Sequence, residues 1–335
     1  MTLNKTSLFT GDLSLPVEVT QTDWATKAGI ELHCLRLDLT DLAVSGNKWF
    51  KLARNIQLAK QQGHSQLLTF GGAFSNHILS TAYECSRQGI ASVGVIRGEE
   101  LNADSNPMLK FAAEAGMQLH FVPRARYRNK YDDESIALYK SHFGEFYIVP
   151  EGGSNQEGVE GCEAIAGFIL NKEYPFDEVF LACGTSATCA GVIRGLSNEK
   201  RKRPHQAYPR VHGVSMFPPS NKESHSSWMK PELERFLNGV VYPYELHETR
   251  DLPAYGKLTE DLKCFISDFY LQTSILLDPI YTGKMLYYVK QLCEKNVILP
   301  SSKVLFIHTG GLHGWLGFDS PAQLSGTIKN RLSSL

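Results

Sequence analysis

The chain has 335 residues, which is long enough for two lobes around a cleft, and it carries 34 basic against 35 acidic residues. This balance gives no global field that would gather nucleic acid or an anionic membrane surface, so we expect a small-molecule partner. No run approaches the roughly 18 apolar residues of a membrane span and the first residues lack a signal-peptide core, which predicts a cytoplasmic protein.

Short apolar runs alternate with longer helical patterns, and glycines separate them, which predicts an open, doubly wound α/β fold. In the first half of the chain we expect strands at 67–70, 92–96, 119–122 and 147–149. Helices are expected from 48 to 58, at 77–88 and at 107–115, and Gly89 and Gly116 follow the last two.

A second series of elements begins near residue 151. We expect strands at 178–182, 211–216, 274–277 and 304–308, and helices at 157–170 and 188–196. The proline- and serine-containing region 217–253 predicts a surface excursion followed by one more helix.

The seven cysteines are scattered and odd in number, and several lie inside apolar runs. This pattern predicts reduced thiols in the core. No CxxC pair or His/Cys spacing typical of a ligand set appears, so we expect no metal site.

Glycine-rich loops follow three strands, at 71–72, 184 and 310–311. In open α/β sheets the ligand lies beyond the carboxyl ends of the strands, so we expect these loops to meet at one pocket.

The loop 183–188 is small and hydroxyl-rich and opens a helix, which suits a phosphate group. An ordinary tight turn with a capping hydroxyl is the alternative. The loop is neither GxGxxG nor GxxxxGK[ST], which argues against dinucleotide and P-loop sites.

Lys48 and Lys51 stand three residues apart at the start of a predicted helix and therefore share a face. One amine then reaches a carbonyl carbon while the other neutralises an attached phosphate. A lysine that forms a Schiff base needs a lowered pKa, which burial or a neighbouring cation provides. An exposed basic helix start is the alternative interpretation.

Residues 46–52, GNKWFKL, resemble the GNKxRKLE signature of the 1-aminocyclopropane-1-carboxylate deaminase / D-cysteine desulfhydrase family of pyridoxal-phosphate enzymes. Further segments are similar to family motifs in the same order, and the match spans about residues 30 to 318. These segments are 72–77, 151–155, 183–188, 278–284 and 308–311.

The resemblance implies a two-domain tryptophan-synthase-β-like fold (fold type II), with open twisted sheets flanked by helices and the active site in the interdomain cleft. Residues 1–45 plus 156–335 would form the large cofactor-binding domain, and 46–155 a small α/β domain inserted into it. The resemblance also implies a homodimer.

Residue by residue, the resemblance implies that Lys48 holds pyridoxal 5′-phosphate as a Schiff base and removes the Cα proton of the substrate. Asn76 would bond the 3′-oxygen of the cofactor, and Thr309 would lie by its pyridine nitrogen. A neutral hydroxyl there favours elimination over transamination. The phosphate would be held by Lys51, Gly184, Thr185, Ser186, Ala187 and Thr188. The substrate would be bound by Ser75, Asn76, His77, Tyr255 and Tyr281.

Ser75 and Tyr281 are also candidate catalytic groups, Ser75 as a nucleophile and Tyr281 as an acid, base or nucleophile. Thr282 and Thr309 stand where D-cysteine desulfhydrases differ from the deaminases, which look acidic and apolar at these positions. The sequence therefore predicts α,β-elimination on a small amino acid such as D-cysteine, giving pyruvate, ammonia and sulfide.

Three alternatives stay open: an aminocyclopropane-carboxylate deaminase, a cofactor-binding relative without this turnover, and a phosphate- or nucleotide-binding module. The last two are motivated by the altered pocket at Phe50, His313 and Trp315. The sequence departs from the family pattern at Phe50, at 257–260 and at 312–315. We expect these positions to flank the substrate pocket.

Overall fold

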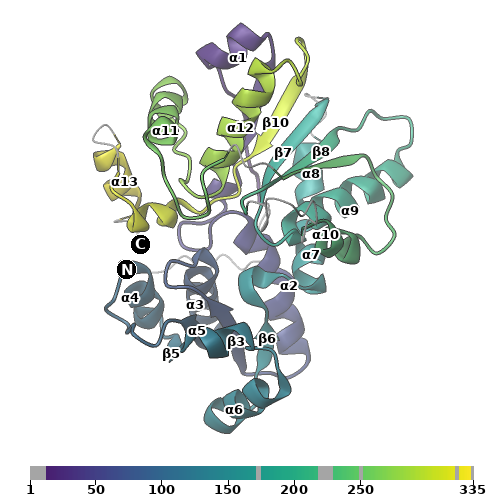
Figure 1. Cartoon of the computed structure of the whole chain (residues 1–335). Helices are drawn as coiled ribbons and strands as arrows, with labels where there is room; N and C mark the ends of the chain where they lie inside the picture. The colour runs from purple at the N-terminus through teal and green to yellow at the C-terminus, as the bar shows by residue number, and fades with distance from the viewer. Residues whose placement is uncertain (1–12, 171–174, 218–228, 249–251, 321–323, 333–335) are drawn as a thin grey trace.

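The computed structural model describes residues 13–170, 175–217, 229–248, 252–320 and 324–332. Two sheets organise the chain (Figure 1): a six-stranded sheet of order β1-β2-β10-β7-β8-β9 and a four-stranded sheet of order β5-β4-β3-β6. The strands are β1 Val17–Val19, β2 Glu31–Leu35, β3 Gln66–Gly71, β4 Ala91–Arg97, β5 Gln118–Val122, β6 Tyr147–Val149, β7 Glu178–Cys183, β8 Arg210–Ser215, β9 Tyr244–His247 and β10 Lys303–Ile307.

The helices are α1 Asp23–Ala28, α2 Asn47–Gln61, α3 Asn76–Gln88, α4 Pro107–Glu114, α5 Arg124–Arg128, α6 Asp133–Phe143, α7 Gln156–Cys162, α8 Ile165–Ile169, α9 Ala187–Lys202, α10 Met229–Leu237, α11 Glu260–Thr273, α12 Thr282–Glu294 and α13 Ser325–Leu332. Three short 3₁₀ turns are η1 Leu37–Leu39, η2 Glu151–Gly153 and η3 Leu312–Gly317. None of these described helices combines the length and the apolar character that crossing a bilayer requires.

The strands pair in parallel except for β1, which is antiparallel to β2. Parallel sheets are covered on both faces, and alternate residues of β7 divide accordingly. Val179 and Leu181 join the core with α2, α7, α8, α9 and α10, whereas Phe180 and Ala182 join the core with α1, α11 and α12. The four strands of the second sheet lie between residues 66 and 149. The domain bounds given above stay a prediction.

The prediction of a strand at 274–277 is wrong, because this segment belongs to neither sheet. Its carbonyl groups accept side-chain hydrogen bonds instead: His308 Nε2 donates to Leu276 O at 2.8 Å and Trp315 Nε1 donates to Leu277 O at 2.9 Å. A short buried apolar run does not distinguish a strand from a packed connection.

Two further expectations need correction. The helix expected at 157–170 is two helices, because α7 ends at Cys162 and α8 begins at Ile165. In the region 217–253, residues 218–228 and 249–251 lie outside the described residues, and the rest contains α10 and the edge strand β9. The sequence did not predict β9.

Helix α7 packs so closely against α2 and α9 that glycines at the contacts leave no room for a side chain. A Cβ atom on Gly161 of α7 would lie 2.0 Å from the carbonyl oxygen of Phe50 in α2, and one on Gly191 of α9 would lie 2.4 Å from Cys162 Cβ. Since α2 carries Lys48 and Lys51, these glycine contacts fix the helix on which the predicted site depends.

We predict that Gly161→Ala lowers the free energy of unfolding by about 1–3 kcal/mol, because the added methyl group meets a backbone oxygen that cannot rotate away. Gly167→Ala in α8 is the matched control, since its Cβ would meet nothing within 4 Å. Urea unfolding measures both variants, and we expect Gly167→Ala to be neutral or slightly stabilising. Equal stabilities would contradict the close α2–α7 contact.

Candidate active site

A pocket of about 910 Å³ opens where strand-end loops of both sheets meet the first turn of α2. The three glycine-rich loops, at 71–72, 184 and 310–311, all contribute to its wall. Of the residues assigned to the site from the sequence, those that line the pocket are Lys48, Lys51, Ser75, Asn76, His77, Gly184, Thr185, Ser186, Thr188, Tyr255, Tyr281 and Thr309. Ala187 is the exception and lies fully buried behind the turn, where its N–H donates to Thr185 O at 2.7 Å.

The start of α2 is fixed by backbone contact with the loop after β10. Gly46 has a φ of +70°, and a Cβ atom on it would lie 1.9 Å from Thr309 O. The next residue, Asn47, donates its backbone N–H to Thr309 O at 3.1 Å and its side-chain Nδ2 to Thr188 Oγ1 at 3.0 Å. Only glycine fits at position 46, and Asn47 ties the helix to the turn after β7.

The two lysines meet at one carbonyl oxygen. Lys48 Nζ lies 3.4 Å and Lys51 Nζ 3.1 Å from Gly152 O, and Lys51 Nζ also lies 3.5 Å from Thr185 Oγ1. Lys51 is 2 % exposed, which excludes the exposed basic helix start considered above. Burial, followed by the charge of Lys51, lowers the pKa of Lys48 well below its ordinary value, and burial also lowers the pKa of Lys51.

The turn between β7 and α9 presents unpaired donors. The backbone N–H groups of Gly184, Thr185 and Ser186 have no acceptor among the described residues. Ser186 adopts a left-handed conformation with a φ of 59°, which is uncommon for a residue other than glycine. Such strain marks functional turns, and these donors at the start of a helix next to Lys51 suit a phosphate group.

The N-terminus of α3 carries three of the assigned residues. Ser75 is the N-cap, and its Oγ accepts a hydrogen bond from Ile78 N at 3.3 Å. His77 contacts Thr69 Oγ1 through Nε2 at 2.8 Å. Because Thr69 donates its own proton to Val149 O, His77 Nε2 carries the proton in this contact. Burial, then Lys48 and Lys51, lowers the pKa of His77 well below its usual value.

The segment 278–284 places a phenol in the pocket. Asp278 is fully buried and accepts hydrogen bonds from the backbone N–H groups of Ile280, Tyr281 and Thr282 at 2.6–3.0 Å. Lys284 donates to Pro253 O and Ala254 O at 3.2 and 2.8 Å, which holds the loop that carries Tyr255. Asp278 and Lys284 thus position the residues around Tyr281 without lining the pocket themselves.

Tyr281 and Tyr255 form a pair, with 3.1 Å between their hydroxyl oxygens. The Tyr281 ring passes over Gly184, where a Cβ atom would lie 3.3 Å from its Cε1. Burial, followed by Tyr255, raises the pKa of Tyr281 well above its ordinary value. The phenol is therefore neutral at physiological pH, which argues against a phenolate nucleophile.

Of the departures from the family pattern, Phe50, His313 and Trp315 lie behind the pocket, whereas Gly314 of the segment 312–315 lines it. Phe50 is buried and packs edge-on against Phe168, with 6.2 Å between ring centroids. His313 and Trp315 are buried as well, and neither they nor residues 257–260 are among the lining residues. The reason is that α2 and η3 each turn one face toward the pocket and the other toward the core.

Two arginines of the pocket wall were not predicted from the sequence. Arg97 ends β4 and Arg124 begins α5 after β5. Arg124 pairs with Glu100 at 3.2 Å, and the Arg97 guanidinium lies 5.8 Å from the Tyr127 ring centroid. The available signal was their position at the carboxyl ends of predicted parallel strands.

A model of the family described as "Pyridoxal-phosphate dependent enzyme" matches residues 19–310. The chain belongs to this family of enzymes. It is 27 % identical over 321 residues to the mitochondrial "Bifunctional D-cysteine desulfhydrase/1-aminocyclopropane-1-carboxylate deaminase" of Arabidopsis thaliana, covering 90 % of this chain and 77 % of the relative. It is 28 % identical over 301 residues to the "D-cysteine desulfhydrase" of Yersinia enterocolitica, covering 84 % of this chain and 87 % of the relative.

A solved structure of an "ACC deaminase homologue" superposes with a TM-score of 0.76 at 24 % identity, and the match covers 95 % of this chain and 94 % of that one. The fold is therefore the two-sheet fold type II of pyridoxal-phosphate enzymes, as the sequence predicted. The cofactor and the relationship to deaminases and desulfhydrases are confirmed in the same way.

The residues of the pocket fit pyridoxal phosphate. Asn76 Oδ1 and His77 Nδ1 are buried atoms without a hydrogen-bond partner in the described part of the chain, which marks a place for a bound polar group. The paired amines of Lys48 and Lys51 form no ion pair among the described residues. A buried cation without a counter-ion is unfavourable, and an anionic cofactor supplies that counter-ion.

We predict that, in the cofactor-free protein, the pH midpoint for acetylation of Lys48 lies well below the ordinary lysine value. The reason is that a lowered pKa leaves the amine neutral, and thus reactive, at lower pH. Lys51→Gln removes the neighbouring cation and should move this midpoint to higher pH. Peptide mass spectrometry measures labelling against pH, with the exposed Lys110 as the reference. A midpoint that Lys51→Gln leaves unchanged would contradict the proximity of the two amines.

Proposed function

We propose that this enzyme eliminates the β-substituent of a small amino acid, most readily D-cysteine, and releases pyruvate, ammonia and sulfide. The observation that carries the proposal is the pair of neutral hydroxyls Thr309, which lines the pocket, and Thr282, which is buried behind it; their Oγ1 atoms lie 3.5 Å apart. The buried carboxylate on the same segment, Asp278, already accepts three backbone N–H bonds. A cofactor nitrogen beside Thr309 therefore meets no acid, and weaker electron withdrawal favours elimination over transamination.

The roles follow from where the side chains lie. Lys48 would hold the cofactor by its aldehyde carbon, and Lys51 with the N–H groups of the turn 184–186 would hold its phosphate. Bound pyridoxal phosphate supplies the electron sink that makes the Cα proton of an amino acid removable. The lowered pKa of Lys48 increases the share of neutral Nζ that is able to accept that proton.

The substrate would lie between α3 and the tyrosine pair. Ser75, Asn76 and His77 stand at the N-terminus of α3, which favours a carboxylate. Tyr281 keeps its proton and would donate it to the departing sulfur, with Tyr255 holding the phenol in place. The homodimer and the cytoplasmic location stay predictions, which size-exclusion chromatography and microscopy of a tagged protein would test.

Deamination of 1-aminocyclopropane-1-carboxylate is the second candidate, because the Arabidopsis relative is described as having both activities. In that case Ser75 would act as a nucleophile. Its Oγ accepts the capping bond from Ile78 N, so the hydroxyl proton still points elsewhere and is available for removal. The two candidates predict different effects of Ser75→Ala. In a deaminase this substitution would abolish ring opening, whereas in a desulfhydrase it would remove only part of the substrate binding.

We predict that the holoenzyme forms pyruvate and sulfide from D-cysteine with a kcat/KM at least tenfold above that for 1-aminocyclopropane-1-carboxylate. Lys48→Ala should lose the activity by at least about 10³-fold, and Tyr281→Phe by about 10²-fold in kcat, since general acid–base groups contribute about 10²–10⁴-fold. Tyr83→Phe, outside the pocket, is the matched control. Pyruvate and sulfide assays give the rates, and borohydride reduction with peptide mapping should place a pyridoxyl group on Lys48.

A yellow holoenzyme that is inert toward a panel of D- and L-amino acids would overturn the elimination and support a cofactor-binding relative without turnover. A preference for the cyclopropane substrate that Ser75→Ala abolishes would overturn it in favour of the deaminase.

A further inference from the structure

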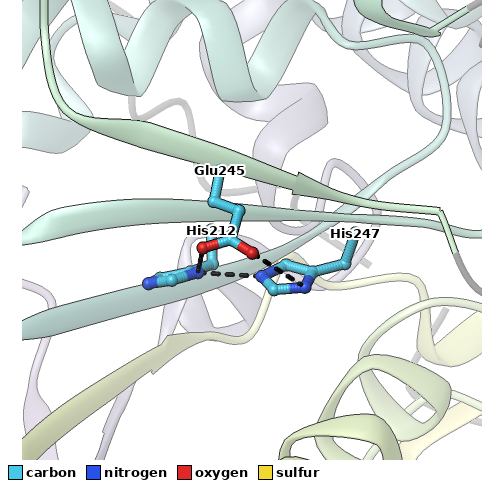
Figure 2. A group of neighbouring side chains, drawn as sticks. All are labelled: His212, Glu245 and His247. Atoms are coloured by element: carbon cyan, nitrogen blue, oxygen red, sulfur yellow. Dashed lines mark hydrogen bonds and ion pairs between the residues drawn. The ribbon is translucent and has the colours of Figure 1, made fainter. Parts of the chain in front are cut away.

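Two histidines and a glutamate meet at the edge of the six-stranded sheet, outside the active-site pocket (Figure 2). His212 lies on β8, and Glu245 and His247 lie on β9. None of the three lines the pocket. Because β8 and β9 are parallel with His212 opposite Glu245, and side chains alternate along a strand, all three side chains leave the same face of the sheet.

A second carboxylate fixes the orientation of His212. Glu178 on β7, on the next strand inward, accepts a hydrogen bond from His212 Nε2 at 2.6 Å. His212 Nδ1 therefore keeps its lone pair. Phe180 stacks on the imidazole ring, with 4.3 Å between centroids and 12° between planes. A carboxylate behind a histidine is the arrangement that orients histidine ligands in metalloproteins.

The free lone pair of His212 points at its neighbours. His212 Nδ1 lies 2.8 Å from His247 Nε2 and 3.9 Å from Glu245 Oε2. One candidate ligand atom from each residue lies within 4.8 Å of the others. Figure 2 shows the Glu245 carboxylate directed toward both rings. Both histidines are buried, while the Glu245 side chain is 51 % exposed and gives access from solvent.

We propose that His212 Nδ1, His247 Nε2 and the Glu245 carboxylate form a binding site for a divalent transition-metal ion of the zinc class. Two imidazoles and one carboxylate suit Zn²⁺, and a water molecule completes its tetrahedron. Zinc–nitrogen bonds of about 2.0–2.1 Å place tetrahedral ligand atoms about 3.3 Å apart. The two nitrogens must therefore separate slightly and the exposed carboxylate must close in.

Metal binding requires one proton to move and none to be lost. Without metal, His247 Nε2 carries the proton that it donates to the lone pair of His212 Nδ1. When the ion takes this place, the proton passes through solvent to His247 Nδ1, which lies 3.5 Å from Tyr288 OH and 3.9 Å from Glu245 Oε1. Burial, then His212, lowers the pKa of His247 to about 4, so this ring is neutral at pH 7.

The site would fasten the edge strand β9 to β8. It is independent of the proposed reaction, because it shares no residue with the pocket. The site could not be found from the sequence, because His212 lies 33 residues before Glu245, and Glu245 and His247 stand on a strand that was not predicted.

The test is titration of the pyridoxal-phosphate holoenzyme with Zn²⁺ by isothermal calorimetry, with Mg²⁺ for comparison. All proteins carry Cys264→Ser, which removes the exposed thiol. We expect one Zn²⁺ per chain, no Mg²⁺ binding, and a rise in the thermal unfolding midpoint with Zn²⁺. Glu245→Gln and His247→Ala should each weaken binding at least tenfold, and Glu178→Gln about 10–100-fold. His142→Ala, an exposed histidine elsewhere, is the matched control and should bind as the parent does.

Glu245→Gln keeps the proposal testable if His247→Ala does not fold, because the Glu245 side chain is half exposed. Absence of Zn²⁺ binding in the Cys264→Ser protein, or equal affinity in this protein and Glu245→Gln, would overturn the site. A loss of affinity in His142→Ala as large as that in Glu245→Gln would overturn it as well.

Discussion

The backbone of Gly46 lies against Thr309 and Gly310, and this contact determines where α2 begins. The helix cannot start earlier or rotate, because Asn47 N is bonded to Thr309 O and the first turn of the helix abuts α7 at Gly161. Lys48 and Lys51 therefore reach Gly152 O from a fixed direction. The reactive amine is positioned by uncharged backbone contacts, which are insensitive to salt and to the protonation of its neighbours.

The positive charges around the Lys48 amine are not balanced by neighbouring carboxylates in the part of the chain that the structure describes. Lys48 and Lys51 stand together, while the pocket carboxylates of Glu100 and Glu151 pair with Arg124 and Lys130 instead. Two crowded amines disfavour their own protonation and attract an anion. The same arrangement lowers the pKa of Lys48 and leaves Lys51 and the N–H groups of the turn 184–186 without an anionic partner among the described residues.

The segment 278–284 shows how a motif divides its work. The carboxylate oxygens of Asp278 accept hydrogen bonds from the backbone, and Lys284 holds the loop that carries Tyr255. Ile280 and Tyr281 face the pocket. The departures at Phe50, His313 and Trp315 have the converse explanation. They lie in the core behind the wall, so they change the packing that supports the pocket and not the side chains that line it.

The sequence alone determined the α/β class, most strands and the cofactor, because these depend on local apolar patterns and short motifs; Lys48 as the residue that holds the cofactor stays a prediction. It failed at 274–277, where side chains of His308 and Trp315 take the carbonyl bonds that a strand would use. Only the tertiary structure decided that Phe50 faces away from the pocket, that Arg97 faces into it, and that His212 meets His247. Each of these depends on which face of an element is covered by a segment distant in the chain, and local periodicity carries no information about that partner.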